Sequence, residues 1–163
     1  MGLDMYLDAR KFISKTNFGL GEGVNNPEYN YILEKSPKGL TDNDGYGYAK
    51  VTLNVGYWRK ANAIHNWFVN ECGGSEDNCQ EIYVSMPELN LLRDSCKKVL
   101  DAPPEERSDV AGEVDLVPIE GFFFGTTEMD EWYIADLEHT VKMIDNLDSV
   151  DYSGWDFSYQ ASW

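Results

Sequence analysis

Two segments at opposite ends of the chain alternate apolar and polar residues with the period of a β-strand. In the first, Leu3, Met5 and Leu7 alternate with acidic or aromatic side chains, and in residues 155–163 aromatic and smaller polar side chains alternate. Period-two alternation gives a strand one buried face. Because the two patterns are equally regular, we predict that the first and last strands pair in one sheet.

Two segments between these ends have the pattern of helices. In residues 57–72 apolar side chains recur at helical spacing on one face and polar side chains on another, and Gly73 follows as a terminator. Ser85 and Glu88 have the spacing of a capping box, in which each residue satisfies a backbone N–H group of the other. This pair predicts a helix that runs to about Leu100.

A third helix is predicted near the end of the chain. Thr126 or Thr127 is its expected N-cap, and its apolar stripe continues to about Leu147. Residues 50–55 and 81–84 have the composition of short strands. The predicted fold class is therefore α+β, with about three helices packed on a small, mainly antiparallel sheet and with long irregular loops.

The length of the chain favours one domain. Its 163 residues, 42% of them hydrophobic, suffice for one core of ordinary size, so we predict a single domain over residues 1–163. Residues 13–47 are rich in Gly, Asn, Pro and Asp and predict a long loop excursion. Residues 101–119 contain prolines and many acids and predict an acidic loop.

The acidic residues are concentrated in the C-terminal part of the chain. Residues 100–163 contain 16 Asp and Glu but only Arg107 and Lys142 as bases, a balance of −14 within a total of −16. Such a field disfavours direct binding to nucleic acid or to an anionic membrane. It is compatible with a basic protein partner, with mimicry of a nucleic acid, or with solubility alone.

Other features bear on location and cofactors. The acidic start of the chain is unlike a signal peptide, and no run approaches the ~20 apolar residues of a membrane span. Cys72, Cys79 and Cys96 are an odd number without a CxxC pair, as is typical of free thiols in a reducing compartment. We therefore expect a cytoplasmic protein with no metal and no cofactor. The oligomeric state is left open.

Four strings of residues are distinctive: MGLDMYL, YWRKANAIHNWFV, GFFFGTTEMDEWY and FSYQASW. Together they resemble a family of small acidic proteins encoded by bacteriophages. Because the strings are distributed over the whole chain, the resemblance extends to the fold. It implies a viral protein that acts in the cytoplasm of a bacterial host, and it implies no particular activity, cofactor or catalytic residue.

The first functional hypothesis is binding to a bacterial host protein with a basic surface, such as one of a nucleic-acid or defence system, which the chain modulates or inhibits. Acids recur every seven residues on the last predicted helix, about 10 Å apart at the rise of an α-helix. The acidic loop adds a second strip, and aromatic residues are frequent interface anchors. The predicted binding residues are Glu131, Glu138, Asp145, Glu105, Glu106, Asp109 and Trp132.

The alternative hypothesis is a small hydrolase or nucleotide-binding protein. His65 would act as general base, Arg59 would neutralise an anionic substrate group, and Glu128 would supply a carboxylate. A polar pocket around them would be formed by Arg59, Lys60, Asn62, Asn66 and Gln160. Charged and amide side chains on an acidic chain are explained as well by local pairing and solvation, so we favour the binding hypothesis.

Overall fold

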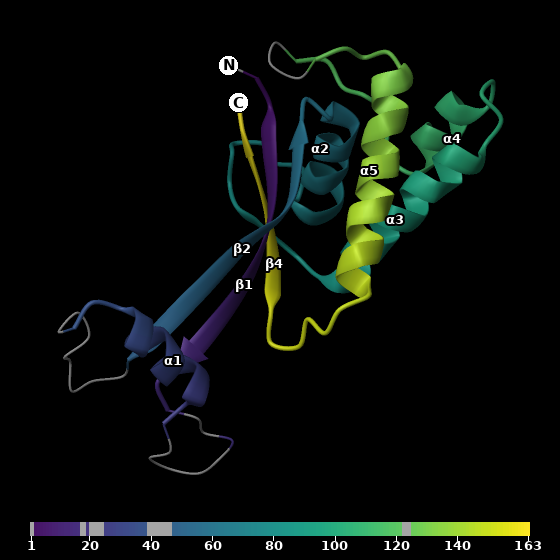
Figure 1. Cartoon of the computed structure of the whole chain (residues 1–163). Helices are drawn as coiled ribbons and strands as arrows, with labels where there is room; N and C mark the ends of the chain where they lie inside the picture. The colour runs from purple at the N-terminus through teal and green to yellow at the C-terminus, as the bar shows by residue number, and fades with distance from the viewer. Residues whose placement is uncertain (1, 17–18, 20–24, 39–46, 122–124) are drawn as a thin grey trace. The chain divides into compact units, whose positions relative to one another are not determined.

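A computed structural model describes residues 2–16, 19, 25–38, 47–121 and 125–163, and it has the predicted α+β class (Figure 1). The described residues form five α-helices rather than about three. In chain order the elements are β1 (Asp4–Ser14), α1 (Pro27–Lys35), β2 (Tyr48–Arg59), α2 (Asn62–Trp67), the π-helical turn η2 (Phe68–Cys72), β3 (Ile82–Val84), α3 (Met86–Asp101), α4 (Arg107–Glu113), α5 (Glu131–Asp148) and β4 (Asp156–Ser162).

The sheet has the strand order β2-β1-β4-β3, so the first and last strands are neighbours, as predicted. Strands β3 and β4 are antiparallel, with Ile82 opposite Tyr159 and Val84 opposite Phe157. Ile82 and Val84 of β3 and Phe157, Tyr159 and Ala161 of β4 are buried, as period-two patterning predicts, and Ser158 is buried as well.

The chain divides into two compact units, and the predicted single domain over residues 1–163 stays a prediction. The first unit is Met1–Ala9 with Asn54–Trp163, and the second is Arg10–Leu53. The boundary falls inside β1 and β2 rather than in a linker, so composition gives no sign of it. Within the second unit, Lys11 forms an ion pair with Glu28, with 2.8 Å between Nζ and Oε1.

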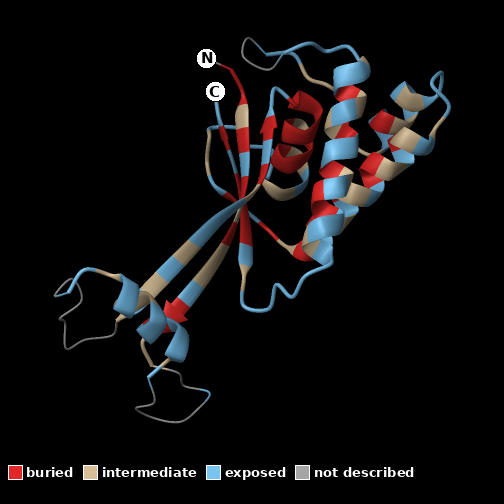
Figure 2. Cartoon of the chain, in the orientation of Figure 1, coloured by how far each residue is buried: buried red, intermediate tan, exposed pale blue. Residues whose placement is uncertain are grey.

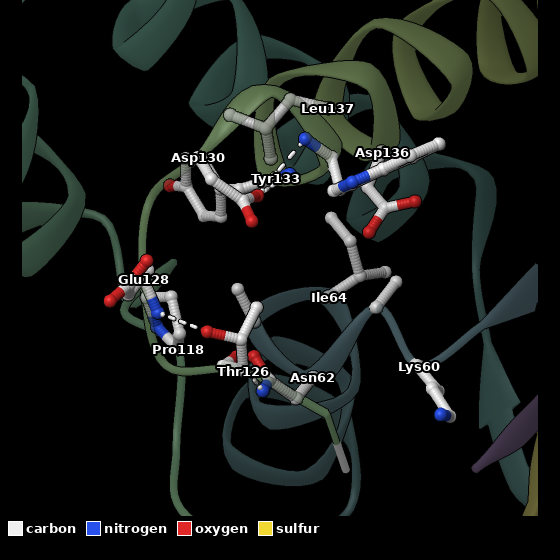
Figure 3. A pocket seen from close by; sticks show the side chains of 13 residues that line it. Lys60, Asn62, Ile64, Pro118, Thr126, Glu128, Asp130, Tyr133, Asp136 and Leu137 are labelled. Carbon is white, nitrogen blue, oxygen red and sulfur yellow. Dashed lines mark hydrogen bonds between the residues drawn. The ribbon is translucent and has the colours of Figure 1, made fainter. Parts of the chain in front are cut away.

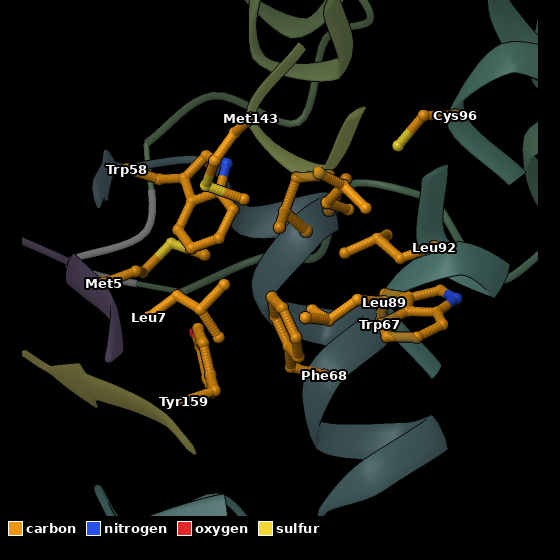
Figure 4. Close-up of a cluster of buried hydrophobic side chains, with 14 of the residues drawn as sticks. Met5, Leu7, Trp58, Trp67, Phe68, Leu89, Leu92, Cys96, Met143 and Tyr159 are labelled. Carbon is orange, nitrogen blue, oxygen red and sulfur yellow. The ribbon is translucent and has the colours of Figure 1, made fainter. Parts of the chain in front are cut away.

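The hydrophobic core of the first unit lies where α2, α3 and α5 pack on the sheet, and their inward faces are the buried ones (Figure 2). The rings of Phe68 and Tyr159 stack with 4.0 Å between their centroids, and Trp58 packs edge-on against Phe68. Figure 4 shows these rings beside Leu7 and Leu89. Within the first unit, the core therefore draws side chains from β1, β2, β4, η2 and α3.

Hydrogen bonds fix where the long helices begin. The predicted capping box at the start of α3 is present, with Ser85 and Glu88 each accepting from the other's backbone N–H. The N-cap of α5 is Asp130 rather than either threonine, and its carboxylate accepts from the backbone N–H groups of Trp132 and Tyr133. The threonine prediction was wrong because Thr126 instead accepts from the N–H of residue 128 in its own turn.

Both predicted loops contain helices. Helix α1 lies within 13–47, begins after the N-cap Asn26 and has Pro27 in its first turn. Residues 17–18, 20–24 and 39–46 of that interval lie outside the described part. Within 101–119, α4 buries Ala111 against the core. With Ala111 as its buried apolar residue, this short helix shows no helical periodicity of apolar residues, so the sequence pattern did not predict it in an acidic, proline-containing segment.

The predicted helix over 57–72 begins later than expected. Strand β2 continues to Arg59, with Gly56 and Trp58 buried and Tyr57 exposed between them. Helix α2 then starts at Asn62. Residues 56–59 alternate in the sequence as a strand does. The prediction assigned residues 57–59 to the helix because the residues that follow have helical spacing.

Candidate functional site

An open-sided pocket lies at the beginning of α5 in the first unit (Figure 3). The room within it for water-sized molecules is about 40 Å³, so the pocket is small. Three segments far apart in the sequence form its wall: the start of α2, the segment before α5, and the first two turns of α5. The lining residues are Lys60, Ala61, Asn62, Ala63, Ile64, Pro118, Thr126, Glu128, Asp130, Trp132, Tyr133, Asp136 and Leu137.

Asp136 is the most perturbed carboxylate of the pocket. Burial, and to a lesser extent the negative charge of Asp130, raise its pKa to about 6. Its carboxylate points into the pocket above Ile64 (Figure 3). Within the described part of the chain it has no hydrogen bond and no ion pair. The pocket thus holds a partly buried acid with which no side chain of the described residues pairs.

Trp132 lies beside this acid on the surface of the first turn of α5. It is 70% exposed, and it follows the exposed Glu131 directly. The Asp130 cap holds its backbone, with 3.0 Å between the Trp132 nitrogen and Oδ1. Large exposed aromatic side chains cost solvation free energy and are enriched at binding surfaces. The start of α5 therefore combines acid, aromatic surface and a pocket.

The structure does not bring the three residues of the enzymatic hypothesis together in this pocket. Glu128 lines it, whereas Arg59 and His65 do not. The His65 ring is buried, and both its nitrogens have partners: Nδ1 lies 2.7 Å from the Tyr159 hydroxyl oxygen and Nε2 lies 3.1 Å from Asp77 Oδ2. Burial, with the nearby charge of Asp77, raises the pKa of Tyr159 well above its ordinary value. These contacts hold α2 to β4.

Only some residues of the predicted polar pocket line the pocket that the structure shows. Lys60 and Asn62 line the pocket, and Asn62 Nδ2 donates to the Thr126 carbonyl oxygen at 2.8 Å. Asn66 accepts instead from the side chain of Asn70 at 3.2 Å, away from the lining. Gln160 donates to the carbonyl oxygen of Cys79 at 3.1 Å. Each of these three amides therefore makes a contact within the fold.

The predicted acidic residues are of two kinds. Asp145 lies between α5 and α3, 3.3 Å from Lys97 Nζ and 3.5 Å from an Arg93 guanidinium nitrogen, so its charge has partners inside the molecule. The others, exposed like Asp145, form no ion pair within the described residues: Glu105, Glu106, Asp109, Glu131 and Glu138. Only this second group leaves its charge available to another molecule.

Sequence reasoning missed Asp136. An isolated acid in a helix gives no signal by itself, and its burial depends on segments 60–64 and 118–128, which are distant in the chain. The one available sign was its position: Asp136 directly precedes the apolar Leu137, which the helical pattern predicts to be buried. A carboxylate at the border of the buried stripe is a candidate for partial burial.

Cys72 and Cys96 do not point to thiolate chemistry. All three cysteines of the chain are free. Burial raises the pKa of Cys72 to about 12, and burial also raises the pKa of Cys96. A protonated thiol is a poor nucleophile and a poor metal ligand. Among the described residues no three His, Cys, Asp or Glu side chains are grouped so that they could hold a metal ion.

Comparison with protein-family models, curated proteins and solved structures gives no match to this chain. No helix in the described residues is both long enough and apolar enough to cross a membrane.

Proposed function

We propose that the chain is a bacteriophage accessory protein that binds a bacterial host protein with a basic surface and modulates or inhibits it. The observation that carries the proposal is the exposed Trp132, 70% accessible, next to carboxylates that have no partner within the described part of the protein. We call Glu128, Glu131 and Trp132 the Trp132 surface. The resemblance of the four sequence strings to phage proteins supports the viral and bacterial setting.

The two components of this surface act at different stages of binding. The net charge of −16 attracts a basic partner, with a range of about 8 Å at physiological salt. Electrostatic attraction mainly raises the association rate and selects the sign of the partner's charge. A buried tryptophan at the centre of an interface supplies the short-range free energy that retains the partner. Together they suit a protein that competes for a channel or groove built for nucleic acid.

Affinity capture from bacterial lysate tests the proposal. The tagged chain is compared with Trp132→Ala and with Asp156→Asn, which removes an exposed acid at the start of β4 and serves as the matched control. We expect a basic protein that binds at low salt, is released at high salt, and is lost with Trp132→Ala but kept with Asp156→Asn. Circular dichroism of each variant verifies that it is folded.

Two outcomes count against the proposal. One is that no salt-sensitive protein is captured. The other is that the captured protein binds Trp132→Ala as strongly as it binds the natural chain, because the Trp132 surface would then have no part in recognition.

A further inference from the structure

We propose that a groove between α3, α4 and η2 receives a lysine side chain of a protein partner, with its ammonium group at the Ser95 hydroxyl and its methylene chain along Leu91. The inference goes beyond the proposed function, because the groove shares no residue with the Trp132 surface. Residues that line the groove include Leu91 and Ser95 of α3, Gly112 and Glu113 of α4, Glu71 of η2, and Asp115.

The groove has room for a side chain and is open on one side. The space for water-sized molecules is about 340 Å³, against about 40 Å³ in the pocket at the beginning of α5. Pockets that take ligands measure roughly 300–1,000 Å³. Helices α3 and α4 lie side by side here (Figure 1). Gly112 leaves the α4 wall open, because a Cβ atom at this position would meet no atom within 4 Å.

The Ser95 hydroxyl is the observation that points to a ligand. Ser95 is only 8% exposed and lines the groove, yet within the described residues its hydroxyl has no hydrogen-bond partner. Proteins normally satisfy a polar group at this depth, because a buried hydroxyl that loses its water partners without replacing them destabilises the fold. A donor that entered the groove would therefore find an acceptor already desolvated.

Leu91 supplies apolar surface beside this hydroxyl. Its side chain is 51% exposed, which is unusual for a leucine in a helix that otherwise packs its apolar residues inward. Ser95 follows one helical turn later on the same face of α3, about 6 Å farther along the axis. Lysine buries its methylene chain along apolar surface and directs its charged end to polar partners. Leu91 followed by Ser95 matches this order of an apolar chain and a polar end.

The charges of the groove favour a cation. Its described lining contains carboxylates and no basic side chain. Two of these carboxylates already have partners: Glu113 pairs with Lys98 at 2.7 Å, and Asp115 accepts from Asn70 Nδ2 at 3.1 Å. Glu71 is exposed and has neither a hydrogen bond nor an ion pair within the described residues. Glu71 is therefore the carboxylate that a bound ammonium group can neutralise.

An ammonium group fits this groove better than a guanidinium does. The ammonium group is compact and has three donors, whereas the guanidinium is a planar fork with five. One hydroxyl at the buried end satisfies one donor, and the remaining donors of an ammonium are left for Glu71 and for water at the open side. A guanidinium at the same depth would leave more N–H groups without acceptors, which costs free energy.

NMR titration with blocked tripeptides tests the inference. The probe is acetyl-Gly-Lys-Gly-amide. One control contains Nε-acetyllysine, which keeps the methylene chain but has no charge, and a second contains arginine. We expect the lysine peptide to shift the backbone amide signals of Leu91, Ser95 and Gly112, the acetyllysine peptide to leave them unchanged, and the arginine peptide to bind several-fold more weakly.

Three substitutions locate the binding site. Ser95→Ala removes the hydroxyl and suits a helix, so α3 should stay folded, and we expect about tenfold weaker binding because a hydrogen bond to a charged group is lost. Glu71→Gln should weaken binding about threefold, as expected for an exposed charge pair. Asp101→Asn removes an exposed acid at the end of α3 outside the groove lining and should leave binding unaltered. Circular dichroism verifies that each variant is folded.

The inference is overturned if the lysine peptide leaves these signals in place, if the acetyllysine or arginine peptide binds as tightly, or if Ser95→Ala binds lysine as the natural chain does. It is also overturned if 1,4-diaminobutane shifts the signals and the lysine peptide does not, because the occupant would then be a free amine. These outcomes are distinct from failure of the proposed function, which depends on capture of a host protein through Trp132.

Discussion

The Nδ1 atom of His65 lies 2.7 Å from the hydroxyl oxygen of Tyr159, and both side chains are buried. On the other side of the ring, Nε2 lies 3.1 Å from Asp77, which also accepts from the indole N–H of Trp163. The histidine that the sequence offered as a general base therefore links helix α2 to strand β4 and to the 73–81 segment.

We expect Tyr159→Phe to destabilise the fold by about 1–3 kcal/mol, because His65 Nδ1 loses a buried partner. Urea unfolding followed by circular dichroism measures the change. The matched control is Tyr83→Phe on the adjacent strand, where the side chain is 64% exposed, and it should change the free energy of unfolding by less than ~0.5 kcal/mol. Equal effects of the two substitutions would contradict a stabilising His65–Tyr159 contact.

A second buried contact holds α5 against β2. Trp58 Nε1 donates to Thr140 Oγ1 at 2.9 Å, and that hydroxyl donates to the Asp136 carbonyl oxygen at 2.7 Å. Thr140→Val keeps the volume but leaves the indole N–H without an acceptor, so we expect a loss of about 1–3 kcal/mol. Thr140→Ser retains the hydroxyl and should lose less. The prediction fails if serine is as destabilising as valine.

The stability of the chain should depend on pH through Asp136. Its pKa is about 6 in the folded protein and 3.8 when unperturbed, so the folded state binds the proton more tightly and the charged form is the less stable one. Its contribution to stability is present below pH 4 and is lost as the pH rises through 6. We expect Asp136→Asn to match the natural chain at pH 4 and to exceed it in melting temperature at pH 7. A difference that is constant with pH would contradict this account.

Because Asp145 forms ion pairs within the molecule, we expect its substitution to lower the stability of the fold and to leave binding to a partner unchanged. Asp145→Asn removes contacts with Arg93 and Lys97 between α3 and α5. Because the pairs are partly exposed, we expect a loss below ~1 kcal/mol that diminishes with added salt. Glu138→Gln, which removes an exposed acid of α5 with no ion pair in the described residues, should be nearly neutral. Calorimetry at low and high salt compares them, and a neutral Asp145→Asn would contradict the role.

The elements with strong local signals could be predicted from the sequence. The alternation of Leu3, Met5 and Leu7 predicted β1, and the Ser85 and Glu88 pair predicted the start of α3. Both signals depend on neighbouring residues alone, through the pleat of a strand and the first turn of a helix. The pairing of the terminal strands followed from the same alternation.

The elements that depend on distant contacts could not be predicted. Helix α4 packs against α3 and buries Ala111 in the core, and the partition into two units falls within continuous strands. Of the predicted site residues, Lys60, Asn62, Glu128 and Trp132 line the pocket. Asp136 acquires its raised pKa only when residues 60–64 and the segment before α5 cover it. The basic residues that pair with Asp145 lie on α3, far away in the sequence. Nothing in the sequence indicated these ion pairs, so Asp145 was predicted to bind another molecule.

Site-specific photocrosslinking tests the central claim most directly. The photoreactive amino acid p-benzoylphenylalanine replaces Trp132 in one variant and the exposed Tyr83 of β3 in a second, and both are irradiated in bacterial cells. We predict that position 132 forms a covalent adduct with a basic host protein and that position 83 does not. Absence of an adduct at position 132, or the same adducts from both positions, would contradict a binding role for the Trp132 surface.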